Sequence, residues 1–426
     1  MKKQAFAVIL SFAMATSILT GCSTSSQSSQ AQSQSSSSGG KVDIFISSPE
    51  YTDAINAAIS EYKKVAPNVT INYETTQSDY STLLKAKINS GEIPDIFSTT
   101  AGRELAAYEP YSYDLTNQPL ISTMTDVVKK GESYNGKILG FPITTQSFGL
   151  IYNPALLQKA GIQNPPKTLN EFSTDCQKLK AAGIQPVSGG FKEWWVFKHI
   201  FQHFEDAAQP NNVSELVNGF IEGKNKFSSY PVLNDNFFTF IDTAVKYGDA
   251  KPLEADQSAE TSAFATGKVA MILGQGPWVE ADIKKIDANL KIGFAGYPVS
   301  NNPSDCKLIV GVDQTLRVNK DSKNIKATLD FCNWLYTSDY GKKWFGNVAH
   351  ALPPVKDAPY PSFDIASATQ EYLKNNTADF PAIEYSLDSF NQKFGEIMQA
   401  YIAKTYTKSQ AIAEIEKQWP LLGASK

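Results

Sequence analysis

Short apolar runs and amphipathic stretches alternate along the chain after residue 40. Residues 42–46, 69–74 and 94–99 are rich in apolar and β-branched side chains, which predicts three buried strands. Between them, apolar residues recur every three or four positions up to Pro67 and Gly91, which predicts two helices that end there. The order strand, helix, strand, helix, strand predicts right-handed crossovers and a parallel sheet, as in α/β proteins.

Cap residues indicate where several predicted helices begin. Thr52 or Asp53 is expected to cap the first helix. Thr168 is followed three residues later by Glu171, the spacing of a capping box, which predicts a helix from there to residue 182. The remaining pattern predicts helices over 153–161, 363–373, 390–402 and 409–419, and strands over 148–152 and 291–299.

The residues that follow the three predicted strands are polar. In an open parallel sheet, ligands bind beyond the carboxyl ends of the strands, so these segments are candidates for ligand contacts. They contain small hydroxyl side chains such as Thr100, the carboxylate of Glu50 and the guanidinium of Arg103. The alternative is that they are ordinary solvated loops, as connecting segments usually are.

Residues 134–154 join a turn, a short apolar run, a polar patch and a second apolar run, so the patch must face water or a ligand. This segment resembles the first interdomain crossing of the family 1 extracellular solute-binding proteins, the sugar-capturing subunits of ATP-binding cassette (ABC) importers. The matching positions are Tyr134, Gly136, Lys137, Gly140, Pro142, Tyr152, Asn153 and Leu156. Further segments match motifs of the family in the same order: residues 94–99, 165–172, 264–278 and 308–337. Two positions depart from the family pattern, Leu169 in place of Trp and Val269 in place of Ala.

The resemblance covers nearly all of residues 41–426 and implies a fold. It implies an α/β, two-lobed type II periplasmic-binding-protein-like fold, with a ligand cleft between the lobes and a three-crossing hinge. The implied lobes are discontinuous: residues 41–146 plus 312–345 form lobe 1, and residues 147–311 plus 346–426 form lobe 2. Chain length also favours two lobes, because single hydrophobic cores stop growing beyond about 250–300 residues.

The first forty residues carry the features of an export signal and a tether. Lys2 and Lys3 precede an apolar stretch too short to span a membrane, which predicts a signal peptide over residues 1–21. The residues up to Cys22 resemble a lipobox, in which the cysteine is lipidated and becomes the new N-terminus; a chance cysteine is the alternative. Residues 22–40, rich in Ser and Gln, predict a flexible tether. We expect a lipid-anchored protein on the extracytoplasmic face of the cell membrane, of the Gram-positive type.

Composition and motifs argue against several classes of function. The 39 basic and 43 acidic residues are nearly balanced and no basic run occurs, so nucleic acid is not an expected partner. No nucleophile elbow, P-loop or dinucleotide fingerprint is present, and we expect neither catalysis nor a cofactor. His199 and His203 lie one helical turn apart near Glu205 and Asp206, but the sequence implies no third ligand and no metal site is expected.

The three cysteines that follow Cys22 cannot all pair with one another. Cys176 and Cys332 lie in apolar helical patterns and are expected in the core. A bridge between Cys306 and Cys332 remains an open alternative.

Three tryptophans are candidate platforms for a sugar. A neutral polyhydroxyl ligand needs flat rings for its apolar faces and polar side chains for its hydroxyl groups. Of the adjacent pair Trp194 and Trp195, helix geometry predicts one in the core and the other exposed. Trp278 follows two glycines and a proline, and this turn is expected to present the ring at the rim of a cleft. The alternative for each ring is a core position, where large rings are common.

Polar residues complete the predicted ligand site. The candidates are Glu50, Thr100, Arg103, Gln146, Lys192, Glu193 and Asp313. The resemblance implies Gln146 at the first crossing, Asp313 at the second crossing, Trp278 in the family's Gly-x-Trp loop, and Trp194 or Trp195 in an aromatic segment.

The sequence thus predicts a monomeric solute-binding lipoprotein that captures a carbohydrate, in particular an oligosaccharide, by hinge closure. Its expected partners are the carbohydrate ligand, the membrane through the lipid anchor, and the permease subunits of an ABC importer. Two alternatives remain. One is a surface-anchored enzyme acting on glycosides, which needs only two carboxylates, and the other is a binding protein for a non-sugar solute.

Overall fold

The computed structural model describes residues 39–76, 79–210, 212–375, 378–379 and 385–424. The predicted signal peptide, Cys22 and nearly all of the predicted tether lie outside these residues. Within the described part of the chain, no helix is both long enough and apolar enough to cross a membrane.

The first sheet has the strand order β12-β3-β1-β2. β1 runs parallel to β2 and to β3, and β12 joins the other edge antiparallel to β3. The parallel arrangement predicted from the sequence is therefore confirmed. The strands are β1 (Gly40–Ile46), β2 (Val69–Thr75), β3 (Ile96–Thr100) and β12 (Gln314–Val318).

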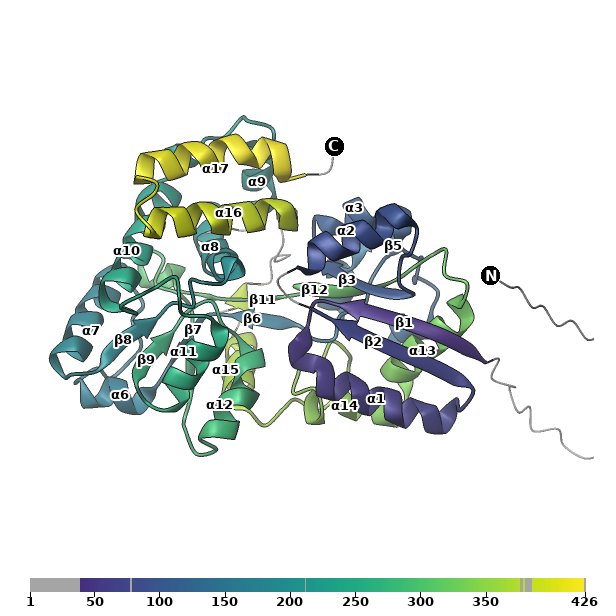
Figure 1. The fold of residues 1–426 in the computed structure, drawn as a ribbon. Helices are drawn as coiled ribbons and strands as arrows, with labels where there is room; N and C mark the ends of the chain where they lie inside the picture. Colours follow the sequence, from purple (N-terminus) through teal and green to yellow (C-terminus); the bar gives the residue numbers. More distant parts are fainter. Residues whose placement is uncertain (1–38, 77–78, 211, 376–377, 380–384, 425–426) are drawn as a thin grey trace, which may run out of the picture. The chain divides into compact units, whose positions relative to one another are not determined.

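Helices cover both faces of this sheet (Figure 1). Ile44 of β1 belongs to the larger core on one face, whereas Phe45 packs with Tyr80 in a smaller cluster on the other face. Alternate residues of one strand thus supply two cores, as the pleat requires. The helices of this half are α1 (Thr52–Val65), α2 (Tyr80–Ser90), α3 (Glu104–Tyr108), α4 (Pro119–Thr123), α5 (Asp126–Gly131), α13 (Ile325–Thr337) and α14 (Asp339–Asn347). We call the first sheet with these helices lobe 1.

Two of the local predictions can be compared with the helix ends. The capping box is confirmed, because the Thr168 hydroxyl accepts from the Glu171 amide and the Glu171 carboxylate accepts from the Thr168 amide. The predicted cap of α1 is wrong. A turn of 3-10 helix over Pro49–Tyr51 leads directly into α1, and Thr52 is its first residue, donating its hydroxyl to the Pro49 carbonyl instead.

The second sheet has the strand order β10-β7-β9-β8. β8 and β9 are parallel, and β7 runs antiparallel to both β9 and β10. Its strands are β7 (Leu150–Tyr152), β8 (Gln185–Ser188), β9 (Val269–Ile272) and β10 (Gly293–Ala295). The predicted strand over 148–152 is broken at Gly149, where a Cβ atom would lie 2.3 Å from the Ala295 carbonyl oxygen. This close approach lets the chain leave one sheet and enter another.

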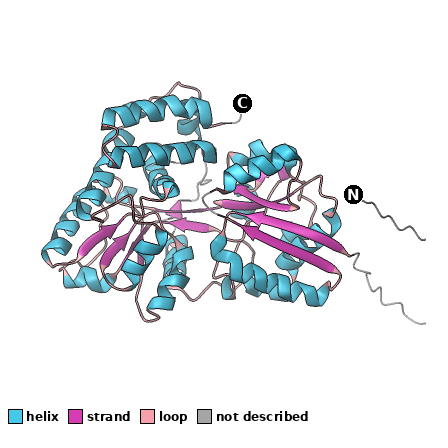
Figure 2. Ribbon diagram, viewed as in Figure 1, coloured by secondary structure: helices cyan, strands magenta, loops and turns pink. Residues whose placement is uncertain are grey.

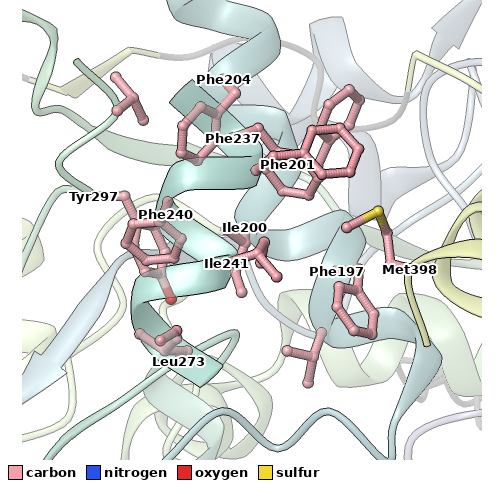
Figure 3. Packing of buried hydrophobic residues seen from close by; sticks show 14 of the residues in the cluster. Phe197, Ile200, Phe201, Phe204, Phe237, Phe240, Ile241, Leu273, Tyr297 and Met398 are labelled. Carbon is pink, nitrogen blue, oxygen red and sulfur yellow. The ribbon is translucent and has the colours of Figure 1, made fainter. Parts of the chain in front are cut away.

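Aromatic side chains dominate the core around the second sheet (Figure 3). Phe201 of α8 packs its ring against Phe237 and Phe394 at centroid distances of 5.0 and 4.5 Å. The helices of this half, which we call lobe 2, are α6 (Pro154–Lys159), α7 (Leu169–Ala181), α8 (Trp194–Ala208), α9 (Val213–Ile221), α10 (Phe238–Tyr247), α11 (Gln257–Ala265), α12 (Glu280–Ile286), α15 (Asp364–Lys374), α16 (Asp388–Ile402) and α17 (Lys408–Leu422).

Strands and loops run between the two lobes (Figure 2), and they belong to segments far apart in the sequence (Figure 1). β6 (Gln146–Phe148) pairs antiparallel with β11 (Leu308–Gly311), which is bordered by β13 (Ala378–Asp379). Thr145 forms an isolated bridge with Leu352, which brings a third segment beside the other two. These segments form the three-crossing hinge of the type II fold.

The packing also bears on where the lobes divide. Ala349, Ala351 and Val355 lie in the core of lobe 1. The predicted boundary after residue 345 therefore falls inside that core, and the last crossing lies further along the chain. Its position depends on packing between distant segments, which the local pattern does not contain.

Two smaller predictions concern a turn and the cysteines. Asn135 and Gly136, both with positive φ, form the predicted turn, which joins β4 (Ser133–Tyr134) to β5 (Lys137–Ile138) as a hairpin. Cys176 and Cys332 are buried as predicted. Cys306 and Cys332 do not pair, and the Cys306 thiol instead donates to the Gly296 carbonyl at 3.3 Å.

Candidate functional site

A cleft lies between the two lobes. Its lobe 1 side is formed by residues that follow β1 and end β3, including Glu50 and Thr100, as expected for the carboxyl ends of parallel strands. Its lobe 2 side includes the start of α8 and the loop after β9. The cleft encloses about 1020 Å³, counting the solvent-filled space at its mouth.

Three tryptophan rings line the lobe 2 side of the cleft. Trp195 is buried, whereas Trp194 and Trp278 are partly exposed. The predicted division of the adjacent pair is thus present, yet both rings reach the cleft because it begins at the N-terminal turn of α8. Such partly exposed indoles are suited to stacking on an apolar face.

The Trp278 ring packs against other aromatic rings, whereas the sequence predicts a ring presented at the rim of the cleft. The residue lies in a 3-10 turn over Pro277–Val279, and edge-to-face contacts place its ring 5.6 to 6.5 Å from Phe148, Trp195 and His199. The ring is half-buried against these neighbours and open to the cleft on its remaining side. It is neither a free-standing platform nor a plug of the core.

His199 presents a neutral imidazole beside these rings. Its Nδ1 lies 2.9 Å from the Gly274 carbonyl oxygen, which only accepts, so Nδ1 carries the proton. Burial lowers the pKa of His199 to about 4, so the ring stays neutral near pH 7. Its Nε2 is then an acceptor, the group needed for a ligand hydroxyl. His203 likewise donates Nδ1–H to a carbonyl, that of Lys307. Among the described residues, no group of three His, Cys, Asp or Glu side chains could hold a metal ion.

The two predicted crossing residues both line the cleft. Gln146 of β6 and Asp313, which follows β11, are both 6% exposed and both line the cleft. The side-chain oxygen of Gln146 accepts no hydrogen bond from any described residue. Asp313 lies 3.6 Å from the ammonium of Lys198, which reaches it from α8 of lobe 2. A buried acceptor without a donor favours a ligand hydroxyl at this position.

Carboxyl groups outnumber cations around the cleft. Besides Asp313, the described lining includes Glu50, Glu104 and Asp388, with Lys198 as its cationic side chain. Burial, and then the nearby Asp388, raise the pKa of Glu104. The surrounding protein also raises the pKa of Glu50, although water in the cleft still reaches this carboxyl and limits the shift.

Three of the predicted site residues, Glu193, Arg103 and Lys192, do not line the cleft. Glu193 lies outside it and faces a neighbouring hollow with Asp256 and Asp282. Arg103 instead reaches from lobe 1 to lobe 2, where its guanidinium donates to the Tyr385 carbonyl oxygen and to the Asn218 side-chain oxygen. Lys192 is exposed and pairs with Asp256 at 2.9 Å.

Direct contacts between the lobes continue beside Arg103. The Ser81 hydroxyl of α2 donates to the Asp388 carboxylate of α16 at 2.8 Å. The Asp388 amide donates to the Glu104 carboxylate at 3.4 Å, and Glu104 also accepts from the Thr100 amide at 3.0 Å. These hydrogen bonds form only while the lobes are together.

Sequence reasoning missed several residues that line the cleft. They include Tyr80, Glu104, Lys198, His199, Asp388 and Gln392. Asp388 and Gln392 lie one helical turn apart on α16, near the end of the chain, and nothing local indicates that α16 reaches the cleft. The sequence shows for His199 only the spacing of a metal ligand, whereas its contact with Trp278 depends on tertiary packing.

The two lobes, the three crossings and the cleft between the lobes define the architecture of extracytoplasmic solute-binding proteins. Residues 27–342 match the family described as bacterial extracellular solute-binding protein, and the chain belongs to this family. The melibiose/raffinose/stachyose-binding protein MelE of Bacillus subtilis is 23% identical over 345 residues, which span 77% of this chain and 76% of that protein.

Solved structures share the fold. A chitin oligosaccharide binding protein superposes with a TM-score of 0.78 at 19% identity, covering 91% of this chain and all of that chain. A sugar transporter from Bacillus licheniformis, crystallised with stachyose, gives a TM-score of 0.76 at 17% identity, covering 89% of this chain and 99% of that chain.

Proposed function

We propose that this protein captures a neutral oligosaccharide in the interlobe cleft and delivers it to the permease subunits of an ABC importer. The observation that carries the proposal is the pairing of aromatic rings with polar acceptors across one cleft. Trp194, Trp195 and Trp278 offer apolar faces on one side, and Glu50 and Thr100 offer polar groups on the other. The names of the relatives support the same class of ligand, because they refer to raffinose, stachyose and chitin oligosaccharides.

The proposed contacts follow from the chemistry of each group. A sugar ring stacks on the exposed face of Trp278, and hydroxyl groups donate to Gln146, Asp313 and the Nε2 atom of His199. The excess of carboxyl groups disfavours anionic solutes, because like charges repel strongly in a partly desolvated site. We therefore propose neutral sugars rather than sugar phosphates or acidic sugars as ligands.

Hinge closure is the proposed mechanism of capture. A ligand that touches both lobes binds the closed state more tightly than the open state, and this difference drives closure. The hydrogen bonds from Arg103 and Ser81 across the lobes add to the stability of the closed state.

We also propose that the chain acts as a monomer anchored outside the cell membrane, of the Gram-positive type, through lipidated Cys22. The support is the lipobox-like sequence before this cysteine and the Ser- and Gln-rich segment after it. Two acyl chains or more suffice for stable attachment, whereas a single chain gives only marginal binding.

A thermal-shift panel tests the proposed ligand class. The panel contains melibiose, raffinose, stachyose and chitin oligosaccharides, with glycerol 3-phosphate and a galacturonic acid oligomer as anionic controls. At a hundred times its dissociation constant, a ligand stabilises the folded protein by about 2.7 kcal/mol, which gives a clear rise in melting temperature. We expect a rise with at least one neutral sugar and none with the anions. A rise with an anion and with none of the neutral sugars would show that the ligand class is wrong.

A further inference from the structure

Two buried polar side chains outside the cleft are hydrogen-bonded in series to Trp278. Glu260 of α11 and Gln275, which follows β9, are both fully buried, and neither lines the cleft. The Gln275 side-chain amide donates to the Glu260 carboxyl oxygen. The Gln275 side-chain oxygen accepts from the Trp278 indole N–H at 3.0 Å.

These partners fix the orientation of the Gln275 amide. An indole N–H only donates, so the amide oxygen must face Trp278 and the amide NH₂ must face Glu260. A flipped amide would place its NH₂ against the indole N–H and leave both donors without an acceptor. Such a loss is costly in a site that water does not reach.

Two glycines leave space for this arrangement. At Gly190, with φ +61°, a Cβ atom would lie 2.8 Å from a Glu260 carboxyl oxygen. At Gly276, a Cβ atom would lie 2.3 Å from Cζ3 of the Trp278 ring. The backbone of Gly190 therefore packs directly against Glu260, and the backbone of Gly276 packs directly against Trp278.

Glu260 is also suited to a neutral role. Burial raises its pKa well above the usual value, and the carboxyl groups of Asp249, Glu193 and Asp256 raise it further, against the hydrogen bond from Gln275. A neutral carboxyl group still offers a carbonyl oxygen to the Gln275 amide. A glutamine at this position would offer the same acceptor with nearly the same shape.

We propose that Glu260 is a positioning residue for ligand binding, acting through Gln275 to hold the Trp278 ring at the angle that faces the cleft. The inference rests on the proposed function, in which Trp278 contacts the sugar. Without this anchor the indole keeps its aromatic neighbours but loses the hydrogen bond that fixes its N–H, so its orientation is less restricted. A stacking surface held in place in advance binds more tightly than one that must be ordered by the ligand.

Paired variants of the full chain separate this role from a purely structural one. Glu260→Gln keeps the acceptor, whereas Glu260→Met fills a similar volume without one. The first readout needs no ligand: the indole N–H signal of Trp278 in a nitrogen-15 NMR spectrum, assigned by its loss in Trp278→Phe. We expect Glu260→Met to shift this signal and speed its exchange with water, and Glu260→Gln to keep both near the wild-type values. Gln275→Met should reproduce the effect of Glu260→Met and serves as the second variant if the first folds poorly.

The second readout is affinity for stachyose, measured by calorimetry. Loss of one net hydrogen bond corresponds to about fivefold weaker binding, which we expect for Glu260→Met, with rescue in Glu260→Gln. In a Trp278→Phe background, which lacks the indole N–H, Glu260→Met should have no further effect. The inference is wrong if Glu260→Met leaves the indole signal or the affinity unchanged, or if it lowers affinity equally in the wild-type and Trp278→Phe backgrounds. These outcomes would leave the proposed function standing. If neither stachyose nor any other neutral sugar of the panel binds the wild type, both the proposed function and this inference are wrong, whatever the indole signal shows.

Discussion

Removal of the Arg103 side chain is predicted to weaken ligand binding from a distance. The guanidinium does not line the cleft, yet it donates from lobe 1 to the Tyr385 carbonyl oxygen and the Asn218 side-chain oxygen of lobe 2. Each hydrogen bond contributes about 1 kcal/mol net, so the pair stabilises the closed state by about 2 kcal/mol. Partial burial, which lowers the pKa of Arg103, offsets part of this gain and makes the figure an upper value. Arg103→Ala should therefore shift the closed-to-open equilibrium by up to about 30-fold.

This shift appears in affinity through linkage. Where the free protein is mainly open, the dissociation constant rises by the full factor, and where it is mainly closed the rise is smaller. Calorimetry with the tightest sugar of the panel measures this rise, and small-angle scattering of the free protein measures the change in its radius of gyration. Lys393→Ala, on an exposed face of α16, is the matched control and should change neither quantity. If Arg103→Ala binds sugar as tightly as the wild type and scatters identically, the contacts across the lobes do not contribute to closure.

Three further predictions concern the cleft and the anchor. Trp278→Ala should weaken sugar binding at least about tenfold. It should lower the free energy of unfolding by less than the roughly 3–5 kcal/mol lost with a fully buried ring, because this ring is partly exposed to the cleft. Calorimetry and denaturant melts measure both quantities, and unchanged affinity would remove Trp278 from the site. Sugar affinity should decrease as pH rises through the range just above the ordinary pKa of a glutamate. Burial, and then the Asp388 carboxyl that closure brings beside it, raise the pKa of Glu104, so the closed state holds the proton more tightly and loses this stabilisation as pH passes through the raised value. Glu104→Gln should flatten the profile, and an identical slope in that variant would contradict the assignment. Cys22→Ala should move the protein from the membrane fraction to the medium with sugar affinity intact, and retention on the membrane would exclude lipidation at this residue.

The sequence predicted the elements whose signals are local. Apolar runs located β1, β2 and β3, and the capping box at Thr168 located the start of α7, because in each case a few neighbouring residues determine the structure. The break at Gly149 was missed because its cause is the carbonyl of Ala295, almost 150 residues away. The packing of residues beyond 345 into a core formed earlier in the chain is likewise a distant contact that the local pattern does not contain.

In the candidate site too, the sequence indicates residues that lie in local motifs and misses residues placed by distant contacts. Gln146, Asp313 and Trp278 line the cleft, and motifs in the sequence mark the crossings and the turn in which they lie. Arg103 follows a strand, which predicts a ligand contact, but in the structure its guanidinium donates to two residues of lobe 2 instead. Glu104 and Asp388 were missed because each belongs to the cleft only when the two lobes are together. Interlobe geometry is therefore the information that a single sequence lacks.

The most direct test of the account is a crystal structure of the protein grown with the neutral sugar that gives the largest thermal shift. We predict density for the sugar in the interlobe cleft, with one ring stacked on Trp278 and hydroxyl groups within hydrogen-bond distance of Gln146 and Asp313. Both lobes should contact the same sugar molecule. A cleft that holds no sugar at saturating concentration, or a sugar bound to the outer face of one lobe, would contradict capture by closure of the cleft.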